Sequence, residues 1–593
     1  MTQTSAAKLK ALRALLKTEK LNGFIIPRQD EFQGEYVAPY AERLRWLTGF
    51  AGSWGTGIVL DKKAAIFVDG RYTTQVREQT DSRFFAPKHL VDEPPAGWIT
   101  TQLKKGEKLG FDPMLLTVSE ARRYQKATWA AGAKLVPVKK NLIDQIWEDQ
   151  PARSQKPLFV QPDKFAGKAA AQKLKELAAQ LKKTGNDAAF IAEPSSVAWL
   201  LNLRGRDVAY TPVVLAYAIL HANAKAELFI EKNRVPADVV KALQGIATVY
   251  DPKELAARLK KLAKKQVLLD EGSAPDYVRA VLEAGKAKVV YGTDPCTMPK
   301  AQKNAVELQG ARDAQRRDGA ALSNFLHWMS AEGSKGELDE KTAATKLQQF
   351  RQATNMLEDL SFPSISAAGA HAAIPHYFVT DDGNAPIKNN QIFLMDSGGQ
   401  YRDGTTDVTR TMIIGAPTPE MRDRFTRVLK GMIAISMSRF PEGTTGSHID
   451  ALARNALWQA GLDFDHGTGH GVGSFLSVHE GPARISKASH VPLKPGMILS
   501  NEPGYYKPGH FGIRIENLLI VTEPAEIEGG ERKMMGFETL TWAPIDRNLI
   551  DVNLLTRSER DWLNAYHARV EKEVSPMMQS EALTWLKEAC RPL

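Results

Sequence analysis

Cysteine is scarce in this chain: its 593 residues include only Cys296 and Cys590, which form no CxxC pair. This scarcity excludes a disulfide framework and a cysteine-ligated zinc site, and it makes a reducing cytoplasm the simplest compartment to expect. Apolar runs of about 20 residues, the length that spans a bilayer, are also missing. The opening residues, MTQTSAAKLKALRALLK, lack an apolar core followed by a cleavage site. We therefore expect neither a secretory signal nor a membrane partner.

Nucleic-acid-binding motifs are missing as well, although the net charge is +10. The first 300 residues contain 47 Lys and Arg against 32 Asp and Glu, whereas the remainder contains 31 against 36. The lysines of the front half lie among Ala and Leu at helical spacing, which is typical of solvated helix faces. No basic motif is interleaved with stacking aromatics, so we expect no nucleic-acid partner, and another anionic partner stays the alternative.

The front half contains one pattern twice. Residues 6–27 and 171–194 each show an amphipathic helix followed by an apolar strand. Each copy then continues into a second short helix with a similar sequence, which is RLRWLTGF in the first copy and SVAWLLNL in the second. A proline-bearing stretch at 151–162 fits a boundary between them. We predict two related α/β domains, residues 1–150 and 151–304.

The rear half shows a different pattern of predicted secondary structure. A long helix is expected over roughly 305–331, and short apolar strands separated by glycine-rich turns follow it. Strands alternating with two or three long helices predict an α+β domain, residues 305–593. The predicted fold class is therefore α/β in front and α+β behind.

Histidines and carboxylates gather in the rear half. Eight of the twelve histidines fall between residues 371 and 510. Asp396 ends the apolar run 392–395, and Asp407 directly precedes the predicted strand 408–414. Their separation suits two neighbouring antiparallel strands, which would place both carboxylates at one end of a hairpin.

Three more candidates follow these two aspartates. Glu502 ends the strand 497–500, and Glu516 is expected inside the strand 513–521, where a lone charge is costly unless it is paired or metal-bound. His470 lies in HGTGHGVG, whose glycines let backbone pack close to the imidazoles. Taken singly, each residue has an ordinary alternative: a turn residue, a structural ion pair or a hydrogen-bonded core histidine. The glycine run completes neither GxGxxG nor GxxxxGK[ST], which weakens a phosphate-loop reading.

Together, four carboxylates and one histidine form a ligand set for hard metal ions. Four negative charges cancel those of two divalent cations, and oxygen-rich ligation favours Mn, Co, Fe or Zn over copper or an iron–sulfur cluster. Two such ions about 3.5–4 Å apart activate a water toward a carbonyl, which predicts a hydrolase.

Several segments carry a family resemblance. MDSGGQYRDGTTDVTRT, HGTGHGVG, NEPGYY and GIRIENLLIV resemble the metal-site segments of the pita-bread metallopeptidases, which include methionine aminopeptidase, prolidase and aminopeptidase P. IPHYFVT, SVHEGP, FETLTWAPID and, in the front half, IFVDGRYTTQV are similar to the long, cytosolic, three-domain branch of aminopeptidase P. The resemblance covers nearly the whole chain and is weakest over residues 205–300. It implies two creatinase-N-like modules, a pita-bread catalytic domain and a cytoplasmic homodimer.

The resemblance also implies a ligand set. The five metal ligands it implies are Asp396, Asp407, His470, Glu502 and Glu516. Asp407 and Glu516 would bridge two divalent ions, most simply Mn²⁺, with Zn²⁺ or Co²⁺ as alternatives. Asp396 would complete one ion, and His470 and Glu502 the other. Glu502 would also be the general base.

Further residues are assigned to substrate by the same resemblance. His479 would donate to the developing oxyanion, and His376 and His466 would position the scissile bond and the proline carbonyl. Arg514 and Arg71 are expected to bind substrate, Arg71 from the first domain. A surface salt bridge is the alternative for Arg71.

The activity implied is release of the first residue from peptides with proline in the second position. A prolidase-type Xaa-Pro dipeptidase is the nearest alternative. A metal-free creatinase-like enzyme and a non-enzymatic binding protein are others, and the complete ligand set argues against both.

Overall fold

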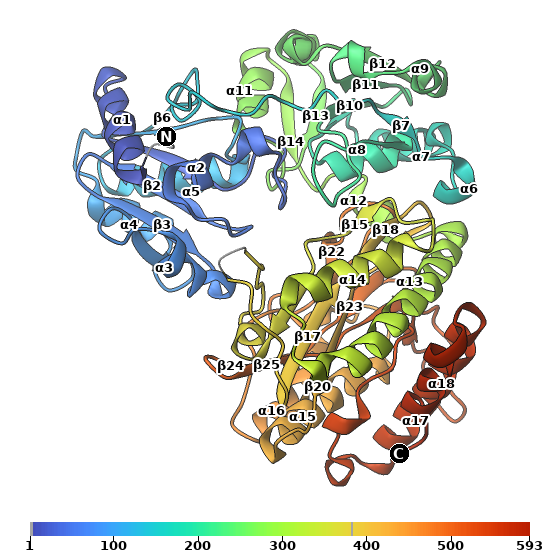
Figure 1. Ribbon diagram of the computed structural model, residues 1–593. Coiled ribbons are helices and arrows are strands. Elements are labelled where there is room, and N and C mark those ends of the chain that lie inside the picture. Colours follow the sequence, from blue (N-terminus) through green and yellow to red (C-terminus); the bar gives the residue numbers. More distant parts are fainter. Residues whose placement is uncertain (1–3, 381–382) are drawn as a thin grey trace. The chain divides into compact units, whose positions relative to one another are not determined.

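The computed structural model describes residues 4–380 and 383–593, which form two compact units. Unit 1 contains residues up to 161 and residues 168–296 (Figure 1, blue to green). Unit 2 contains residues 162–167 and 297–593 (Figure 1, mainly yellow-green to red). No helix among the described residues is both long and apolar enough to cross a membrane.

The first sheet of unit 1 has six strands in the order β4-β3-β2-β1-β5-β6. Its central strand β1 (Gly23–Pro27) pairs antiparallel with β2 (Thr56–Leu60) and parallel with β5 (Lys108–Phe111). The outer strands are β3 (Ala64–Val68), β4 (Ala86–His89) and β6 (Lys134–Pro137). Helix α1 (Ser5–Thr18) precedes β1 and buries Leu9, Leu12 and Leu16, which lie on one face at helical spacing.

The second sheet of unit 1 repeats this plan, with the order β12-β11-β10-β8-β13-β14. Its central strand β8 (Ala188–Ile191) pairs antiparallel with β10 (Tyr217–His221) and parallel with β13 (Gln266–Leu269). The remaining strands are β11 (Ala226–Phe229), β12 (Ala247–Tyr250) and β14 (Lys288–Tyr291). Helix α7 (Ala170–Lys183) buries Leu174, Leu177 and Leu181. The predicted helix–strand repeat is therefore confirmed, while the boundaries at 150 and 304 stay a prediction.

Unit 2 contains the predicted long helix, α13 (Ala305–Glu332). A capping box fixes its start: the Asn304 side chain accepts from the backbone N–H of Glu307, and the Glu307 side chain accepts from that of Asn304. Helix α14 (Glu340–Gln352) packs against α13 and against the edge of a three-stranded sheet. That antiparallel sheet has the order β16-β17-β20, with bounds Ile365–Ala368, Gln391–Ser397 and Val408–Ile414.

A second antiparallel sheet of unit 2 has five strands, in the order β22-β21-β23-β26-β27. Their bounds are Gly469–Gly471 for β21, Glu480–Ile485 for β22, Ile498–Asn501 for β23, Asn517–Val521 for β26 and Phe537–Thr539 for β27. Between β23 and β26 the chain forms a separate hairpin of β24 (Gly504–Lys507) and β25 (Phe511–Arg514).

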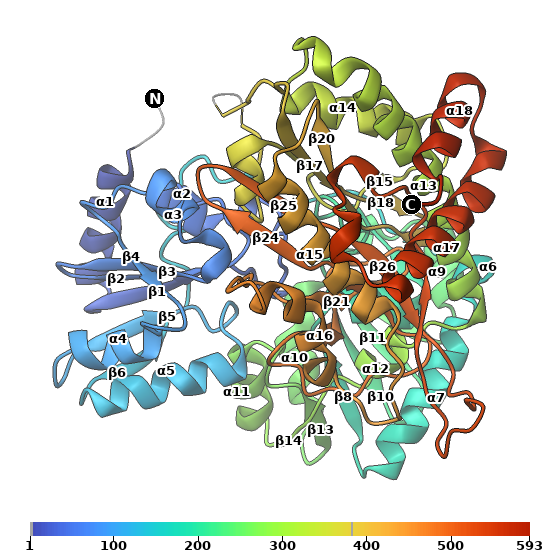
Figure 2. The same ribbon diagram turned by 90° about the horizontal axis from the view of Figure 1, so that it is seen from below.

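Helices α15 (Pro419–Ser436) and α16 (Gly446–Trp458) lie side by side in unit 2 (Figure 2). Their close approach needs glycine at 431, because a Cβ there would lie 2.1 Å from the carbonyl oxygen of Ala453. Val428, Leu429 and Met432 of α15 are completely buried in the main apolar cluster of the unit. Helix α15 also packs against β23, β24 and β25.

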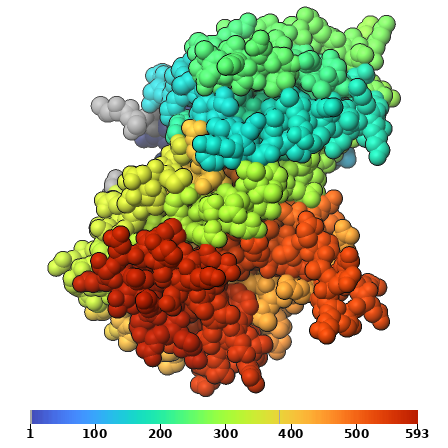
Figure 3. Space-filling view, turned by 90° about the vertical axis from the view of Figure 1, so that its right-hand side faces the viewer, coloured from blue at the N-terminus to red at the C-terminus, as the bar shows by residue number. Residues whose placement is uncertain are grey.

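The C-terminal helices are α17 (Arg557–Val574) and α18 (Ser580–Ala589). A capping box of Thr556 and Glu559, whose T-x-x-E pattern is visible in the sequence, begins α17. Leu563, Tyr566 and Val570 of α17 join the apolar cluster of α15. The C-terminal residues, red in Figure 3, gather on one face of unit 2. The tail therefore packs into the main apolar core of unit 2.

Candidate metal centre

The two aspartates lie where the sequence predicts them. Strands β17 and β20 are antiparallel partners, with Asp396 opposite Thr409 and Ser397 opposite Val408. Asp407 directly precedes β20, so both carboxylates lie at the same end of this strand pair. Both are buried. The predicted hairpin arrangement is therefore confirmed.

The two glutamates lie at the end of another strand pair. Asn501, the last residue of β23, is opposite Asn517, the first residue of β26. Glu502 therefore follows one strand and Glu516 precedes the other. The expectation that Glu516 lies inside a single strand 513–521 is wrong, because β25 ends at Arg514 and β26 begins at Asn517. The strand breaks where the chain changes partner, from β24 to β23.

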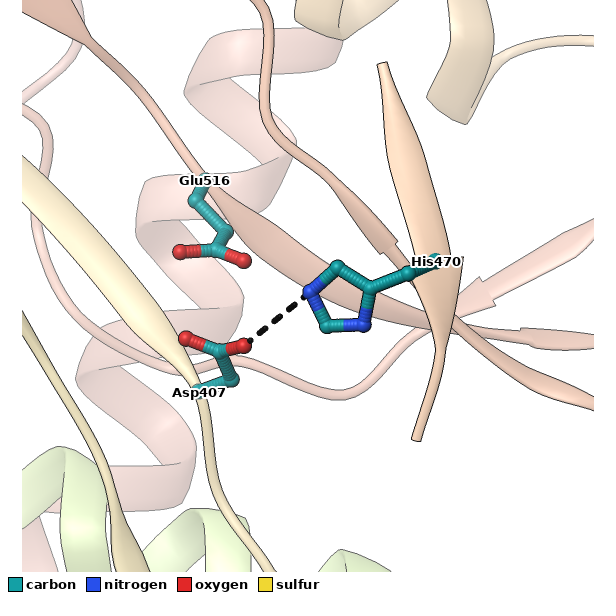
Figure 4. A group of neighbouring side chains, drawn as sticks. All are labelled: Asp407, His470 and Glu516. Atoms are coloured by element: carbon teal, nitrogen blue, oxygen red, sulfur yellow. Dashed lines mark ion pairs between the residues drawn. The ribbon is translucent and has the colours of Figure 1, made fainter. Parts of the chain in front are cut away.

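Three of the predicted ligands converge from separate segments of unit 2: His470 from β21, and Asp407 and Glu516 from the residues just before β20 and β26. Asp407, His470 and Glu516 each offer a ligand atom, and these atoms all lie within 4.8 Å of one another (Figure 4). The His470 Nε2 is 3.4 Å from Asp407 Oδ2 and 3.5 Å from Glu502 Oε1. Residues more than 100 positions apart in the sequence thus form one cluster of nitrogen and oxygen donors.

Asp396 provides a direct test of whether this cluster fits a metal ion. Its Oδ2 accepts a 2.6 Å hydrogen bond from Nη2 of Arg514. Its Oδ1 is buried and has no hydrogen-bond partner among the described residues. A buried carboxylate oxygen without a partner is costly, and a cation is the partner that would satisfy it. The donor set therefore fits a metal centre.

The electrostatics of the metal-free cluster point the same way. Burial raises the pKa of Glu516 well above its ordinary value, and the charges of Asp407, Asp396 and Glu502 raise it further. Burial also raises the pKa of Asp396 and of Glu502. Carboxylates packed this closely can all be ionised only if positive charge is added among them.

His470 leads to a testable pH dependence. Burial alone would lower its pKa, but the hydrogen bond to Asp407 and the charge of Glu502 outweigh burial and raise it to about 9. At pH 7 a metal ion must therefore displace a proton from this imidazole, so the affinity should rise between pH 6 and about pH 9. Titration calorimetry of the metal-free protein with Mn²⁺ at pH 7 should give different heats in buffers of different ionisation enthalpy. Equal heats would show that no proton is released.

One further histidine contacts this centre, and a second is linked to it through Tyr506 and Arg514. The ring of His479 lies edge-on to that of His470, with the centroids 4.3 Å apart. Nε2 of His466 is 2.8 Å from the hydroxyl of Tyr506, which also accepts a hydrogen bond from Nη1 of Arg514. The structure thus brings His479 into contact with the cluster and links His466 to it through Tyr506 and Arg514. The catalytic roles of both histidines stay predictions.

His376 lies in the segment between η6 (Gly369–Ala373) and β17. The buried Glu340 holds this segment, since it accepts hydrogen bonds from Tyr377 Oη at 2.9 Å and from the backbone N–H of Ala368 at 2.8 Å. His371 Nδ1 is also 2.8 Å from Glu340. The proposed contact of His376 with substrate stays a prediction.

The two predicted substrate-binding arginines have different surroundings. Arg514 is 2% exposed. Its guanidinium donates hydrogen bonds to Asp396, to Tyr506 and, at 3.3 Å, to Thr409. Arg71 belongs to unit 1, where its Nη2 is 2.7 Å from Asp69. Their substrate contacts stay predictions.

Tyr506 and Thr409 are functional candidates that sequence reasoning missed. Thr409 donates a 2.9 Å hydrogen bond to Oε2 of Glu516, and Tyr506 links His466 to Arg514. Both lie within recognised segments, TTDVTRT and NEPGYY, which is the only signal the sequence gives for them.

Protein-family profiles match most of the chain. Residues 309–523 match the profile of metallopeptidase family M24, and residues 533–593 match the C-terminal region of peptidase M24. Residues 8–146 and 149–307 each match a creatinase/prolidase N-terminal domain.

Matches to individual relatives cover the whole chain. A probable Xaa-Pro aminopeptidase P of Talaromyces marneffei is 39% identical, and one of Aspergillus fumigatus is 40% identical; each match covers 100% of this chain and 93% of the relative. The solved X-prolyl aminopeptidase of Caenorhabditis elegans, described as a cytosolic enzyme with a di-nuclear active site, is 34% identical. It superposes with a TM-score of 0.95, covering 100% of both chains.

The chain belongs to metallopeptidase family M24: two creatinase-type N-terminal modules precede a pita-bread catalytic domain. Within this family it belongs with the Xaa-Pro aminopeptidase P proteins.

Proposed function

We propose that this protein releases the N-terminal residue from peptides with proline in the second position, using two divalent metal ions. The observation that carries the proposal is the convergence of Asp407, His470 and Glu516 from three separate segments of the chain. The proposed metal ligands are Asp396, Asp407, His470, Glu502 and Glu516. We propose Mn²⁺ as the metal, with Zn²⁺ and Co²⁺ as alternatives, because the donors are mostly carboxylate oxygens.

When bound, the ions supply Lewis acidity and a water of lowered pKa. The chain itself supplies proton transfer and orientation. Glu502 is the proposed general base, which takes a proton from the attacking water and delivers it to the departing proline nitrogen. Ser500 Oγ orients this carboxylate by donating a 3.1 Å hydrogen bond to Oε1.

The neighbouring histidines act on the substrate in this proposal. His479 donates to the oxygen of the scissile carbonyl as negative charge develops there. His466, fixed by Tyr506, and His376 orient the peptide around the scissile bond. Arg514 and Arg71 are proposed to hold the rest of the substrate. Proline has no N–H, so its recognition needs no acceptor at that position.

We further propose that the protein is a cytoplasmic homodimer. Both cysteines, Cys296 and Cys590, are buried free thiols, as a reducing compartment allows. The nematode relative is described as cytosolic.

Three peptides test the proposed specificity in the metal-loaded enzyme: Arg-Pro-Pro, Arg-Ala-Pro and the dipeptide Arg-Pro. We expect free arginine from Arg-Pro-Pro at a kcat/KM at least about 10-fold above that for Arg-Ala-Pro, since one well-matched apolar contact contributes about 1–3 kcal/mol. A clear preference for Arg-Pro would instead indicate a prolidase-type dipeptidase.

A further inference from the structure

Beside the metal centre lies a buried ion cluster that the proposed chemistry does not use. We name it the Glu480 cluster; it comprises Glu480, Lys300 and Lys303. Glu480 Oε1 is 2.6 Å from Nζ of Lys303, and Oε2 is 3.2 Å from Nζ of Lys300. Exposed fractions are 3% for the glutamate, 2% for Lys300 and 6% for Lys303.

Stability alone is a poor explanation for such a cluster. Lysine is almost never fully buried unless it is paired, and two lysines here face one carboxylate. Replacing a buried ion pair by apolar groups of similar size is often neutral or stabilising, because desolvation offsets much of the attraction. The position of the cluster therefore calls for an explanation beyond its energy.

The cluster lies next to the metal centre because Glu480 and its strand partner are each adjacent in sequence to a histidine of the centre. Glu480 begins β22 and directly follows His479, whereas its pairing partner in β21, Gly471, directly follows His470. The rings of the two histidines are in edge-on contact at 4.3 Å. The pairing is irregular between Gly471 and His470, which lies opposite Arg484, so a regular ladder does not set the contact between the two imidazoles. The pair of Glu480 and Gly471 is the link adjacent to both histidines.

Glu480 is held at both its backbone and its carboxylate. A Cβ on Gly471 would lie 2.2 Å from the Glu480 carbonyl oxygen, and one on Gly473 would lie 3.1 Å from Oε2. Only glycine permits β21 and the turn after it to approach this closely. The two lysines, from α12 (Thr297–Ala301) and the residues between α12 and α13, hold the carboxylate.

We propose that Glu480 is a positioning residue, anchored by Lys300 and Lys303, that fixes the His479 imidazole beside His470 for donation to the substrate oxygen. The inference rests on the proposed function, because His479 acts on substrate only there. Catalytic groups must be held within about 0.5 Å of their productive positions. A misplacement of about 1 Å can lower the rate by about 100-fold.

A double-mutant cycle tests the inference. Glu480→Gln, His479→Ala and the double variant are assayed on Arg-Pro-Pro, with kcat expressed per metal-loaded molecule. We expect Glu480→Gln to lower kcat by about 10- to 100-fold with KM changed by less than about twofold, because the lost contact forms only in the transition state. The double variant should match His479→Ala within about threefold, since Glu480 acts through that imidazole. Multiplying losses would overturn the inference, and so would an unchanged kcat in Glu480→Gln.

Further variants separate positioning from folding. If Glu480→Gln fails to fold, the triple variant Lys300→Met, Lys303→Met, Glu480→Gln removes all three charges and should fold. Its kcat should show the same loss, and a wild-type kcat would overturn the inference. Glu480→Asp keeps the charge and should lose less than Glu480→Gln.

Lys335→Met is the matched control, because it removes an exposed lysine that is paired with Glu332 at 2.7 Å. Its kcat should equal that of the wild type. If the wild type itself releases no arginine, the proposed function fails and the inference falls with it. If the wild type is active and the losses multiply, only the inference fails.

Discussion

Asp407→Asn lowers kcat/KM for Arg-Pro-Pro by at least about 10³-fold, which corresponds to about 4 kcal/mol of transition-state stabilisation. The substitution keeps the shape of the side chain but removes one of the charges that hold the cations. Asp407 is buried, lies 3.4 Å from His470 and shares the cluster of ligand atoms with Glu516. The amide can replace the carboxylate sterically, so the fold and its thermal unfolding should change little.

Asp561→Asn is the control for this prediction. It makes the same chemical change in α17 at an exposed carboxylate that is 3.8 Å from Arg557. Its kcat/KM should stay at the wild-type value. Metal content, measured on each purified variant, should fall only in Asp407→Asn. Retention of more than about a tenth of the wild-type activity by Asp407→Asn would remove this residue from the metal site.

Arg410→Met lowers the free energy of unfolding by about 3–5 kcal/mol, because it leaves several buried acceptors without a donor and each such acceptor costs about 1–3 kcal/mol. Arg410 is 2% exposed. Its guanidinium donates hydrogen bonds to the carbonyl oxygens of Thr409, Glu516, Ala543 and Pro544 and to the side-chain oxygens of Asn517 and Tyr566. Methionine satisfies none of these acceptors, so the strand end that carries Glu516 loses its tie to the C-terminal region.

Urea unfolding measures this loss. Arg410→Lys should recover only part of it, because one ammonium cannot reproduce the planar fork of the guanidinium. Arg557→Met, at an arginine whose side chain is 93% exposed, should shift the free energy by less than about 0.5 kcal/mol. An Arg410→Met protein that unfolds at the wild-type urea concentration would contradict the role given to this network.

Local patterns predicted much of this fold. The spacing of Leu9, Leu12 and Leu16 defines the buried face of α1, and the capping pattern at Thr556 marks the start of α17. The positions of Asp396 and Asp407 beside apolar runs in the sequence predict that both carboxylates lie at one end of a strand pair, as they do. These signals are local, so the sequence alone carries them.

Features that depend on tertiary pairing were missed. The strand breaks at Glu516 because β25 pairs with β24 whereas β26 pairs with β23. The mostly apolar sequence of residues 513–521 does not reveal this change of partner. Glu480 meets Lys300 across 180 positions, a pairing that charge patterning along the chain cannot show. The link from His466 through Tyr506 to Arg514 likewise forms only when the β24–β25 hairpin, which contains Tyr506 and Arg514, meets the segment of His466.

Release of the N-terminal residue from a peptide with proline in the second position should require a bound metal ion. The measurement that tests it most directly is hydrolysis of Arg-Pro-Pro by metal-stripped enzyme, before and after Mn²⁺, Co²⁺ or Zn²⁺ is restored separately. We predict no free arginine from the stripped enzyme and restored release with at least one ion, fastest with Mn²⁺. Failure to release arginine with any of the three ions would contradict the claim.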